Sequence, residues 1–222
     1  MDSKILILRH GITEGNQKKW FYGATDISLC EEGRRKLREQ RDNGFYPQVS
    51  GDVQFFTTGL KRTEETLKIL FGDVEYRQIK DMQEMNFGDY ECKPFDLLKD
   101  DELFLEWGYD ETGEVKLPNA ESRNEFRKRT SRGGRFLIKE HISKKVAVSV
   151  MICHGGVISS FMNELFDDGR TMWDWMPEPG CGYEILISNG KPKEYRAIGR
   201  IGDKLQTTIE EYEAEQSKNI EK

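Results

Sequence analysis

Two runs of apolar residues, each ending in a histidine followed by glycine, constrain the fold of this chain more than any other feature. Residues 5–8 lead into Arg9-His10-Gly11, and residues 146–153 lead into His154-Gly155-Gly156. Apolar runs without alternation are typical of strands buried on both faces, as in a parallel sheet. Such a sheet brings the carboxyl ends of its strands, and the binding or catalytic groups that follow them, to one edge. Because the chain has only three histidines, two in this setting predict one shared site.

Strand and helix signals alternate along the rest of the chain. This alternation favours a single α/β domain over residues 1–222, with a mostly parallel central sheet and helices on both faces. Further strands are expected at 53–56, 75–79, 182–187 and 194–198. Helices are expected from the capping-box sequence Ser28-Leu29-Cys30-Glu31 to residue 44, from a cap at Thr57 or Thr58 to Gly72, and at 121–141 and 156–166. The glycine pair in the 121–141 helix should weaken its middle by about 1 kcal/mol per glycine.

Two segments depart from this alternation. Residues 91–118 are less periodic and rich in aromatic and acidic residues, which predicts a small inserted subregion with one or two short helices over the site. The aromatic side chains are expected to pack the insertion onto the domain, although stacking on a ring of the substrate is an alternative. Residues 208–222 form a charged C-terminal tail.

The composition of the chain limits the classes of partner that it is expected to bind. With 36% hydrophobic and 33% charged residues the chain should be globular with a charged surface, and its net charge of -6 argues against nucleic acid or an anionic membrane as the main partner. No stretch is long enough to span a bilayer, and the amino terminus does not read as a secretory signal. The four cysteines lack the paired spacing of a zinc site or disulfide framework, so a cytoplasmic location is expected. A homodimer stays possible.

The first candidate segment, residues 9–16, reads Arg-His-Gly-Ile-Thr-Glu-Gly-Asn. A guanidinium binds two oxygens at once, a hydroxyl and an amide donate single bonds, and glycines let main-chain N–H groups approach a ligand. The segment therefore suits a tetrahedral oxyanion. Its alternative is an ordinary β-to-α turn with a solvated Arg-His pair.

Other candidates come later in the chain. Arg62 should lie near a helix amino terminus, where the helix dipole adds to its own charge, or else pair with a neighbouring glutamate on an exposed helix face. A carboxylate among Glu84, Asp89 and Glu91 could protonate a leaving oxygen. Glu84 has the most apolar neighbours, but composition leaves the three hard to separate. His141, in a charged helical stretch, is expected to be structural.

Together these segments resemble the histidine phosphatase superfamily, the phosphoglycerate-mutase-like family, and within it the phosphatase branch. The motifs are Arg-His-Gly-x-Thr-x-x-Asn at 9–16, Thr-Thr-x-Leu-x-Arg-Thr at 57–63, Glu-x-x-x-Gly-x-Tyr-Glu at 84–91 and Cys-His-Gly-Gly-Val at 153–157. They stand in the family's order and span most of the chain, and Pro-Asn-Ala-Glu-Ser at 118–122 is similar to a further family element. Cys92 departs from the pattern, because glycine often follows the acidic residue there.

The resemblance implies the phosphoglycerate-mutase-like fold and a role for each matching residue. His10 would be the nucleophile, transiently phosphorylated, and Glu84 the proton donor. The phosphoryl oxygens would be held by side chains and main chain at Arg9, Arg62, His154, Asn16, Gly11, Thr13, Gly23 and Gly155. No metal or other cofactor is implied.

The resulting interpretation is a metal-independent phosphatase acting on a small phosphorylated metabolite. A phosphoglycerate mutase is one alternative, although a mutase must keep water off its phosphohistidine with closing segments that are not evident here. A non-catalytic phospho-ligand binding module is another. Sugar phosphates, nucleotides and the ribazole phosphate known as a substrate of relatives all stay open.

Overall fold

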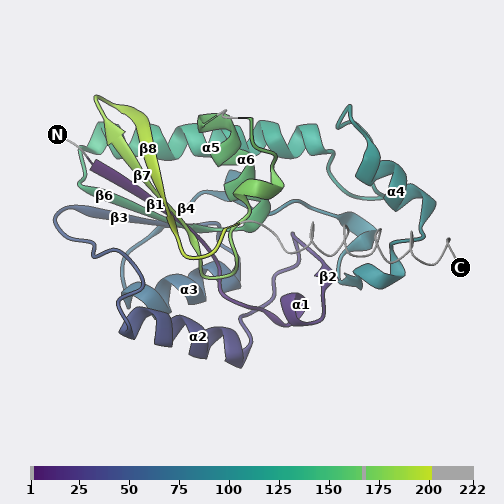
Figure 1. Cartoon of the computed structure of the whole chain (residues 1–222), viewed down its shortest axis with the longest axis horizontal. Helices are drawn as coiled ribbons and strands as arrows, with labels where there is room; N and C mark the ends of the chain where they lie inside the picture. Colours follow the sequence, from purple (N-terminus) through teal and green to yellow (C-terminus); the bar gives the residue numbers. More distant parts are fainter. Residues whose placement is uncertain (1–2, 167–168, 202–222) are drawn as a thin grey trace, which may run out of the picture.

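The computed structural model describes residues 3–166 and 169–201, which form a central six-stranded sheet with helices on both faces (Figure 1). The strand order is β4-β3-β6-β1-β7-β8. Only β7, of the sheet strands within those ranges, runs against the others. The predicted mostly parallel α/β sheet is therefore confirmed. Its strands are β1 (Ser3–Arg9), β3 (Val53–Thr57), β4 (Arg77–Gln78), β6 (Val148–Cys153), β7 (Gly182–Ser188) and β8 (Lys191–Ile198).

Both faces of the sheet are covered because its central strands are apolar on both sides. In β1, Ile5 and Ile7 join one buried cluster, whereas Leu6 and Leu8 join the other. Figure 1 shows α2 (Glu31–Asp42) and α3 (Lys61–Phe71) below the sheet, and α5 (Arg123–Lys144) and α6 (Gly155–Leu165) above it. Successive strand residues point to opposite faces, so four consecutive aliphatic residues supply both layers.

Two helix starts differ from the expectation. The cap of α2 is Cys30, whose Sγ accepts from Gly33 N at 3.4 Å, and not Ser28. Leu29 forms a β-bridge with Thr13, which keeps the chain extended at this residue, so the helix begins only at Glu31. The cap of α3 is Leu60, without a side-chain bond. Thr58, predicted as a possible cap, instead contacts His154.

The segment 91–118 carries two short helices, η3 (Phe95–Leu97) and α4 (Glu102–Tyr109), and the strand β5 (Lys93–Pro94). β5 pairs with β2 (Trp20–Phe21), just after α1 (Glu14–Gln17). Phe21 lies 3.9 Å from Phe87 and 4.9 Å from Phe104 between ring centroids, and Trp107 lies 5.7 Å from Phe104. These aromatic residues pack on one another, which supports a structural role over substrate stacking.

Helix α5 runs without a break through Gly133 and Gly134. A Cβ at Gly133 would lie 2.6 Å from Met82 Cγ, and one at Gly134 would lie 2.4 Å from Phe161 Cε2. The glycines thus let the helix approach both α6 and η1 (Lys80–Met82) closely. The remaining short helices are η2 (Gly88–Tyr90) and η4 (Trp173–Trp175).

The predicted tail at 208–222 lies outside the described residues. In the two described ranges, no helix combines the length and apolar character needed to cross a membrane.

Candidate active site

Adjacent parallel strands deliver the two predicted site histidines to the same edge of the sheet. Arg9 at the end of β1 is the register partner of Cys153 at the end of β6, so His10 and His154 each follow the same rung. Their ring centroids are 5.3 Å apart, with the planes at 62°. Both side chains are buried, with 4% and 0% exposure. The structure therefore brings together two residues that are far apart in the sequence.

The backbone fixes the His10 ring. Its Nδ1 lies 2.7 Å from Gly11 O, and since a carbonyl oxygen only accepts, Nδ1 carries the proton of this bond. Burial lowers the pKa of His10 well below its ordinary 6.5, and the charges of Arg62 and Arg9 lower it further. The ring is therefore neutral near pH 7, with the lone pair on Nε2. The Gly11 N–H, predicted to hold a phosphoryl oxygen, donates to Thr66 Oγ1 at 3.0 Å.

His154 is held by Thr58. Its Nε2 lies 2.9 Å from the Thr58 hydroxyl, whereas Nδ1 is buried without a hydrogen-bond partner among residues 3–166 and 169–201. Burial lowers its pKa, followed by the charges of Arg62 and His10. His154 thus presents one unoccupied ring nitrogen beside His10.

Arg62, fully buried on the first turn of α3, is anchored by a loop. Its two terminal nitrogens donate to Thr25 O at 2.7 Å and Gly23 O at 2.5 Å, and the ring of Tyr22 lies 5.3 Å from Cζ. The exposed-helix alternative for Arg62 is wrong. Burial lowers the pKa of Arg62 below its usual range, and nearby Tyr22 and then Glu84 oppose this shift only in part.

Arg9 is held near the start of α6. One terminal nitrogen donates to Pro177 O at 2.8 Å, and a Cβ built on Gly155 would lie 3.2 Å from its Cζ and Nε. Gly155 therefore leaves room for the guanidinium at the amino terminus of α6. The Nε atoms of both Arg9 and Arg62 are buried without a hydrogen-bond partner among the residues described.

The position of each candidate carboxylate separates the three that the sequence left open. Glu84 Oε2 accepts from Gly156 N, and Oε1 accepts from Met85 N, both at 3.0 Å. A Cβ at Gly23 would lie 3.1 Å from Glu84 Cγ, so Glu84 also borders the Arg62 anchor. Asp89 is exposed and accepts from Asn119. Glu84 is thus the candidate that faces the histidines through the start of α6.

Glu91 has a different task. Its carboxylate accepts from the N–H groups of Gly23, Ala24 and Thr25, the Thr25 hydroxyl and Phe87 N, at 2.6 to 3.1 Å. These bonds hold the loop whose carbonyl oxygens anchor Arg62. Glu91 is therefore committed to positioning, which sequence reasoning did not foresee.

Thr13 and Asn16 form a tight turn at the start of α1. Asn16 Oδ1 accepts from Thr13 N, from the Thr13 hydroxyl and from Tyr22 OH, while Thr13 caps the helix. Thr13 is fully buried, and its hydroxyl lies 2.5 Å from Tyr22 OH. Tyr22, half-buried beside Arg62, is a site residue that the motifs did not signal. His141 lies elsewhere and bonds Ser149 and Ser3, in keeping with its predicted structural role.

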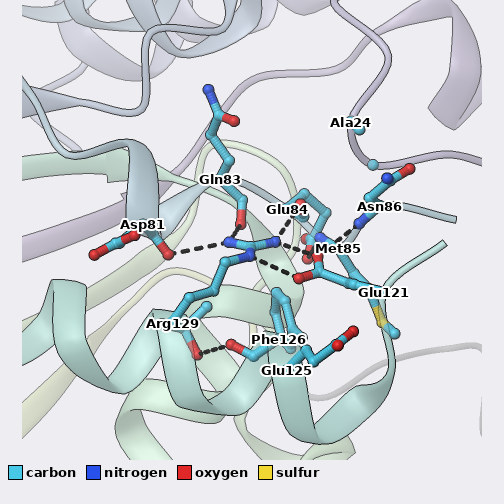
Figure 2. A network of polar contacts seen from close by, with 12 residues as sticks. Ala24, Asp81, Gln83, Glu84, Met85, Asn86, Glu121, Glu125, Phe126 and Arg129 are labelled. Atoms are coloured by element: carbon cyan, nitrogen blue, oxygen red, sulfur yellow. Dashed lines mark hydrogen bonds and ion pairs between the residues drawn. The ribbon is translucent and has the colours of Figure 1, made fainter. Parts of the chain in front are cut away.

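The guanidinium of a second unforeseen residue, Arg129 of α5, lies beside the backbone of Gln83 and Glu84 (Figure 2). Its guanidinium bonds the backbone of the segment that carries Glu84 and the carboxylate of Glu121. Nothing in the sequence separates Arg129 from the other arginines of this helix, such as Arg127 and Arg132.

The arrangement brings one neutral imidazole, two guanidinium groups, a second imidazole and one carboxylate to the same edge of the sheet. Among residues 3–166 and 169–201, no three His, Cys, Asp or Glu side chains gather in a way that would hold a metal ion. The guanidinium groups and imidazoles of this site suit the oxygens of a tetrahedral anion, because charged N–H groups in a buried site stabilise negative charge strongly.

Comparison with known proteins agrees with this chemistry. The sequence profile described as "Histidine phosphatase superfamily (branch 1)" matches residues 5–198. The uncharacterized phosphatase PhoE of Bacillus subtilis is 26% identical over 163 residues, 72% of this chain and 76% of that protein. A 2,3-bisphosphoglycerate-dependent phosphoglycerate mutase of Parvibaculum lavamentivorans is 32% identical over 97 residues, 40% of this chain and 44% of the mutase. The crystal structure of the α-ribazole phosphatase of Shigella flexneri shares the fold, with a TM-score of 0.70, 24% identity, and coverage of 90% of this chain and 95% of that one.

Proposed function

The chain belongs to the histidine phosphatase superfamily, and we propose that it is a metal-independent phosphatase that hydrolyses small phosphate monoesters through a phosphohistidine on His10. In this proposal Glu84 is the proton donor, and Arg9, Arg62 and His154 hold the phosphoryl oxygens. Asn16 and the amino terminus of α6 at Gly155 assist.

One observation carries the proposal: three buried polar nitrogens without hydrogen-bond partners among the described residues belong to the neighbours of His10. They are the Nε atoms of Arg9 and Arg62 and Nδ1 of His154. Buried polar groups are nearly always hydrogen-bonded, and an unpaired one costs about 1–3 kcal/mol. Three such atoms around one imidazole support a site for an oxyanion, whose oxygens would accept the missing hydrogen bonds.

The geometry supports a two-step reaction. His10 Nε2 attacks phosphorus, the bond from phosphorus to the leaving oxygen breaks, and Glu84 gives its proton to that oxygen. A water molecule then attacks the phosphohistidine, Glu84 takes a proton from it, and the phosphorus–nitrogen bond breaks to release phosphate. The guanidinium groups stabilise charge on the equatorial oxygens in both steps.

The decisive experiment is phosphate release from an aryl phosphate in the presence of EDTA. Wild-type protein is expected to retain activity, and His10→Ala to lose about three orders of magnitude or more. His141→Gln is the matched control, since that histidine lies outside the site. Activity lost on chelation would contradict the metal-independent mechanism, and activity retained in His10→Ala would contradict the nucleophile.

The partial identity to a phosphoglycerate mutase favours one second candidate, phosphoryl transfer within a phosphoglycerate. A mutase returns the phosphoryl group to the substrate before water reaches the phosphohistidine. Product analysis separates the two: free phosphate supports the phosphatase, whereas isomerised phosphoglycerate supports the mutase. An intact substrate that binds without turnover would indicate a binding module instead.

A further inference from the structure

The segment that carries Glu84 has no regular secondary structure. Residues 83–87 lie between η1 and η2, outside any helix or strand ladder. Proton donation depends on placing the carboxyl group within hydrogen-bond distance of the leaving oxygen. Something other than a strand or helix must therefore fix this backbone.

The guanidinium of Arg129 makes the required contacts (Figure 2). NH1 donates to Asp81 O at 3.0 Å and Gln83 O at 2.6 Å, NH2 donates to Glu84 O at 2.8 Å, and the remaining bonds go to Glu121. A guanidinium has five N–H donors in a fixed plane, and all five are used here. Lysine, with a single nitrogen, cannot reproduce this pattern.

Glu121 completes the arrangement from the other side. Its Oε1 and Oε2 both accept from Arg129, and Oε1 also accepts from Asn86 N at 2.8 Å. The side chains of Arg129 and Glu121 are only 20% and 16% exposed. Such a bidentate pair is stronger and more directional than an exposed ion pair. The segment is thus bonded at residues 81, 83 and 84 by Arg129 and at 86 by Glu121.

We propose that Arg129, supported by Glu121, is a positioning residue that holds Glu84 for proton donation. The inference rests on the proposed function for the role of Glu84. Helix α5 supplies a rigid base, because its close packing at Gly133 brings it against Met82 and Asp81. Loss of the guanidinium frees the carbonyl oxygens of residues 83 and 84, and the Glu84 carboxylate then loses its fixed place beside Gly156 N.

The test compares Arg129→Lys with Arg132→Ala on two substrates, p-nitrophenyl phosphate and glycerol 3-phosphate. Arg132 is the matched control, because it lies on the same helix, pairs with the partly exposed Asp81 carboxylate at 2.6 Å and, within residues 3–166 and 169–201, bonds no backbone oxygen of residues 81–87. For Arg129→Lys, kcat/KM on the alkyl ester should fall about 30-fold or more and kcat/KM on the aryl ester less than about threefold, since kcat/KM reports formation of the phosphohistidine, where only a poor leaving group needs protonation. Arg132→Ala should change neither. Glu121→Gln should give the same selective loss in a milder form.

Hydrogen–deuterium exchange of peptides covering residues 81–87 provides a readout independent of activity. Arg129→Lys should accelerate exchange there and Arg132→Ala should not. Equal losses on both substrates, no loss on either, or unchanged exchange would each overturn the proposal. An inactive wild type would instead refute the proposed function, and the exchange data would still decide whether Arg129 fixes the segment. If Arg129→Lys fails to fold, Glu121→Gln is judged by the same criteria.

Discussion

Cys92 adopts a backbone conformation that its side chain disfavours. Its φ is 60°, in the left-handed region, while its N–H donates to Phe21 O at 2.8 Å. Residues with a Cβ cost roughly 1–2 kcal/mol in this region, whereas glycine enters it freely. Cys92 follows Glu91 in the chain, and family members often carry glycine at the position of Cys92. The cysteine at this position therefore costs backbone strain that glycine would avoid.

Cys92→Gly should therefore stabilise the protein. The relief of strain exceeds the added entropy of the unfolded chain, for a net gain of about 0.5–1 kcal/mol in the free energy of unfolding. Urea denaturation measures the gain, with Cys92→Ala as the control that keeps the Cβ and hence the strain. An equal gain in the alanine variant would show that the thiol, and not φ, is responsible.

The two bonds that Glu84 accepts from backbone N–H groups lead to a prediction for Glu84→Gln. The amide fills the same space but cannot supply the carboxyl proton, so kcat/KM on an alkyl phosphate should fall about 10²–10³-fold, while kcat/KM on an aryl phosphate, which does not include hydrolysis of the phosphohistidine, should fall less than about tenfold. Steady-state kinetics on both esters provides the test, and Asp89→Asn, at an exposed position, serves as control. A uniform loss would place the proton donor elsewhere.

At the scale of secondary-structure elements, the sequence predicted existence better than boundaries. The central strands β1 and β6 follow from aliphatic runs, and Gly72 ends α3 with a φ of 80° as expected. The start of α2 could not be predicted, because the bridge between Thr13 and Leu29 joins residues distant in the chain. The pairing of β2 with β5 also joins segments that are distant in the chain. In addition, each strand has only two residues, which is too short to show a detectable period in the sequence.

The same distinction holds for the site. Motifs suffice to nominate His10 and His154, because each follows a recognisable strand. They cannot nominate Arg129, since its role depends on carbonyl oxygens of an irregular segment, and carbonyl oxygens leave no trace in a sequence. Positioning residues that bond backbone carbonyl oxygens can therefore be identified only from the three-dimensional structure.

The amino terminus of α6 fixes the acid, which makes Gly156 a sensitive position. A Cβ there would lie 2.7 Å from Glu84 Oε1 and would push the carboxylate away. Alanine favours the helix by up to about 1 kcal/mol over glycine, so Gly156→Ala should leave thermal stability unchanged or higher. The expected loss of alkyl phosphatase activity is about tenfold or more. Unchanged kinetics, with calorimetry showing a folded protein, would contradict this placement of Glu84.

For the molecule as a whole, the described histidines make stability depend on pH. Burial lowers the pKa of His10, His141 and His154 below the ordinary 6.5. Below pH 6.5 the unfolded chain binds protons that the folded protein does not, so stability falls as pH falls. Carboxylates with lowered pKa, such as Asp81, act only near and below their ordinary value of 3.8. Between pH 6.5 and 5, protonation of the histidines in the unfolded chain therefore dominates the change in the free energy of unfolding.

The free energy of unfolding, measured by urea denaturation between pH 7.5 and 5, should decrease steadily on acidification. The decrease should be up to about 1.4 kcal/mol per histidine for each pH unit below 6.5, and the urea midpoint should fall with it. His141→Gln removes one titrating group and should flatten the profile without abolishing it. Non-phosphate buffers avoid stabilisation by a bound anion. A midpoint that is constant or rises over this range would contradict the burial of neutral imidazoles.

The pairing of β1 with β6 also governs when the molecule becomes competent. His10 and His154 meet only after these strands align, although 144 positions (154 − 10) separate them in the chain. Contacts between such distant residues slow folding, because their formation requires a long loop to close. During synthesis the first histidine emerges far ahead of its companion and has no chemistry to perform. The rate at which activity returns after dilution from denaturant therefore measures how fast β1 and β6 pair at the centre of the sheet.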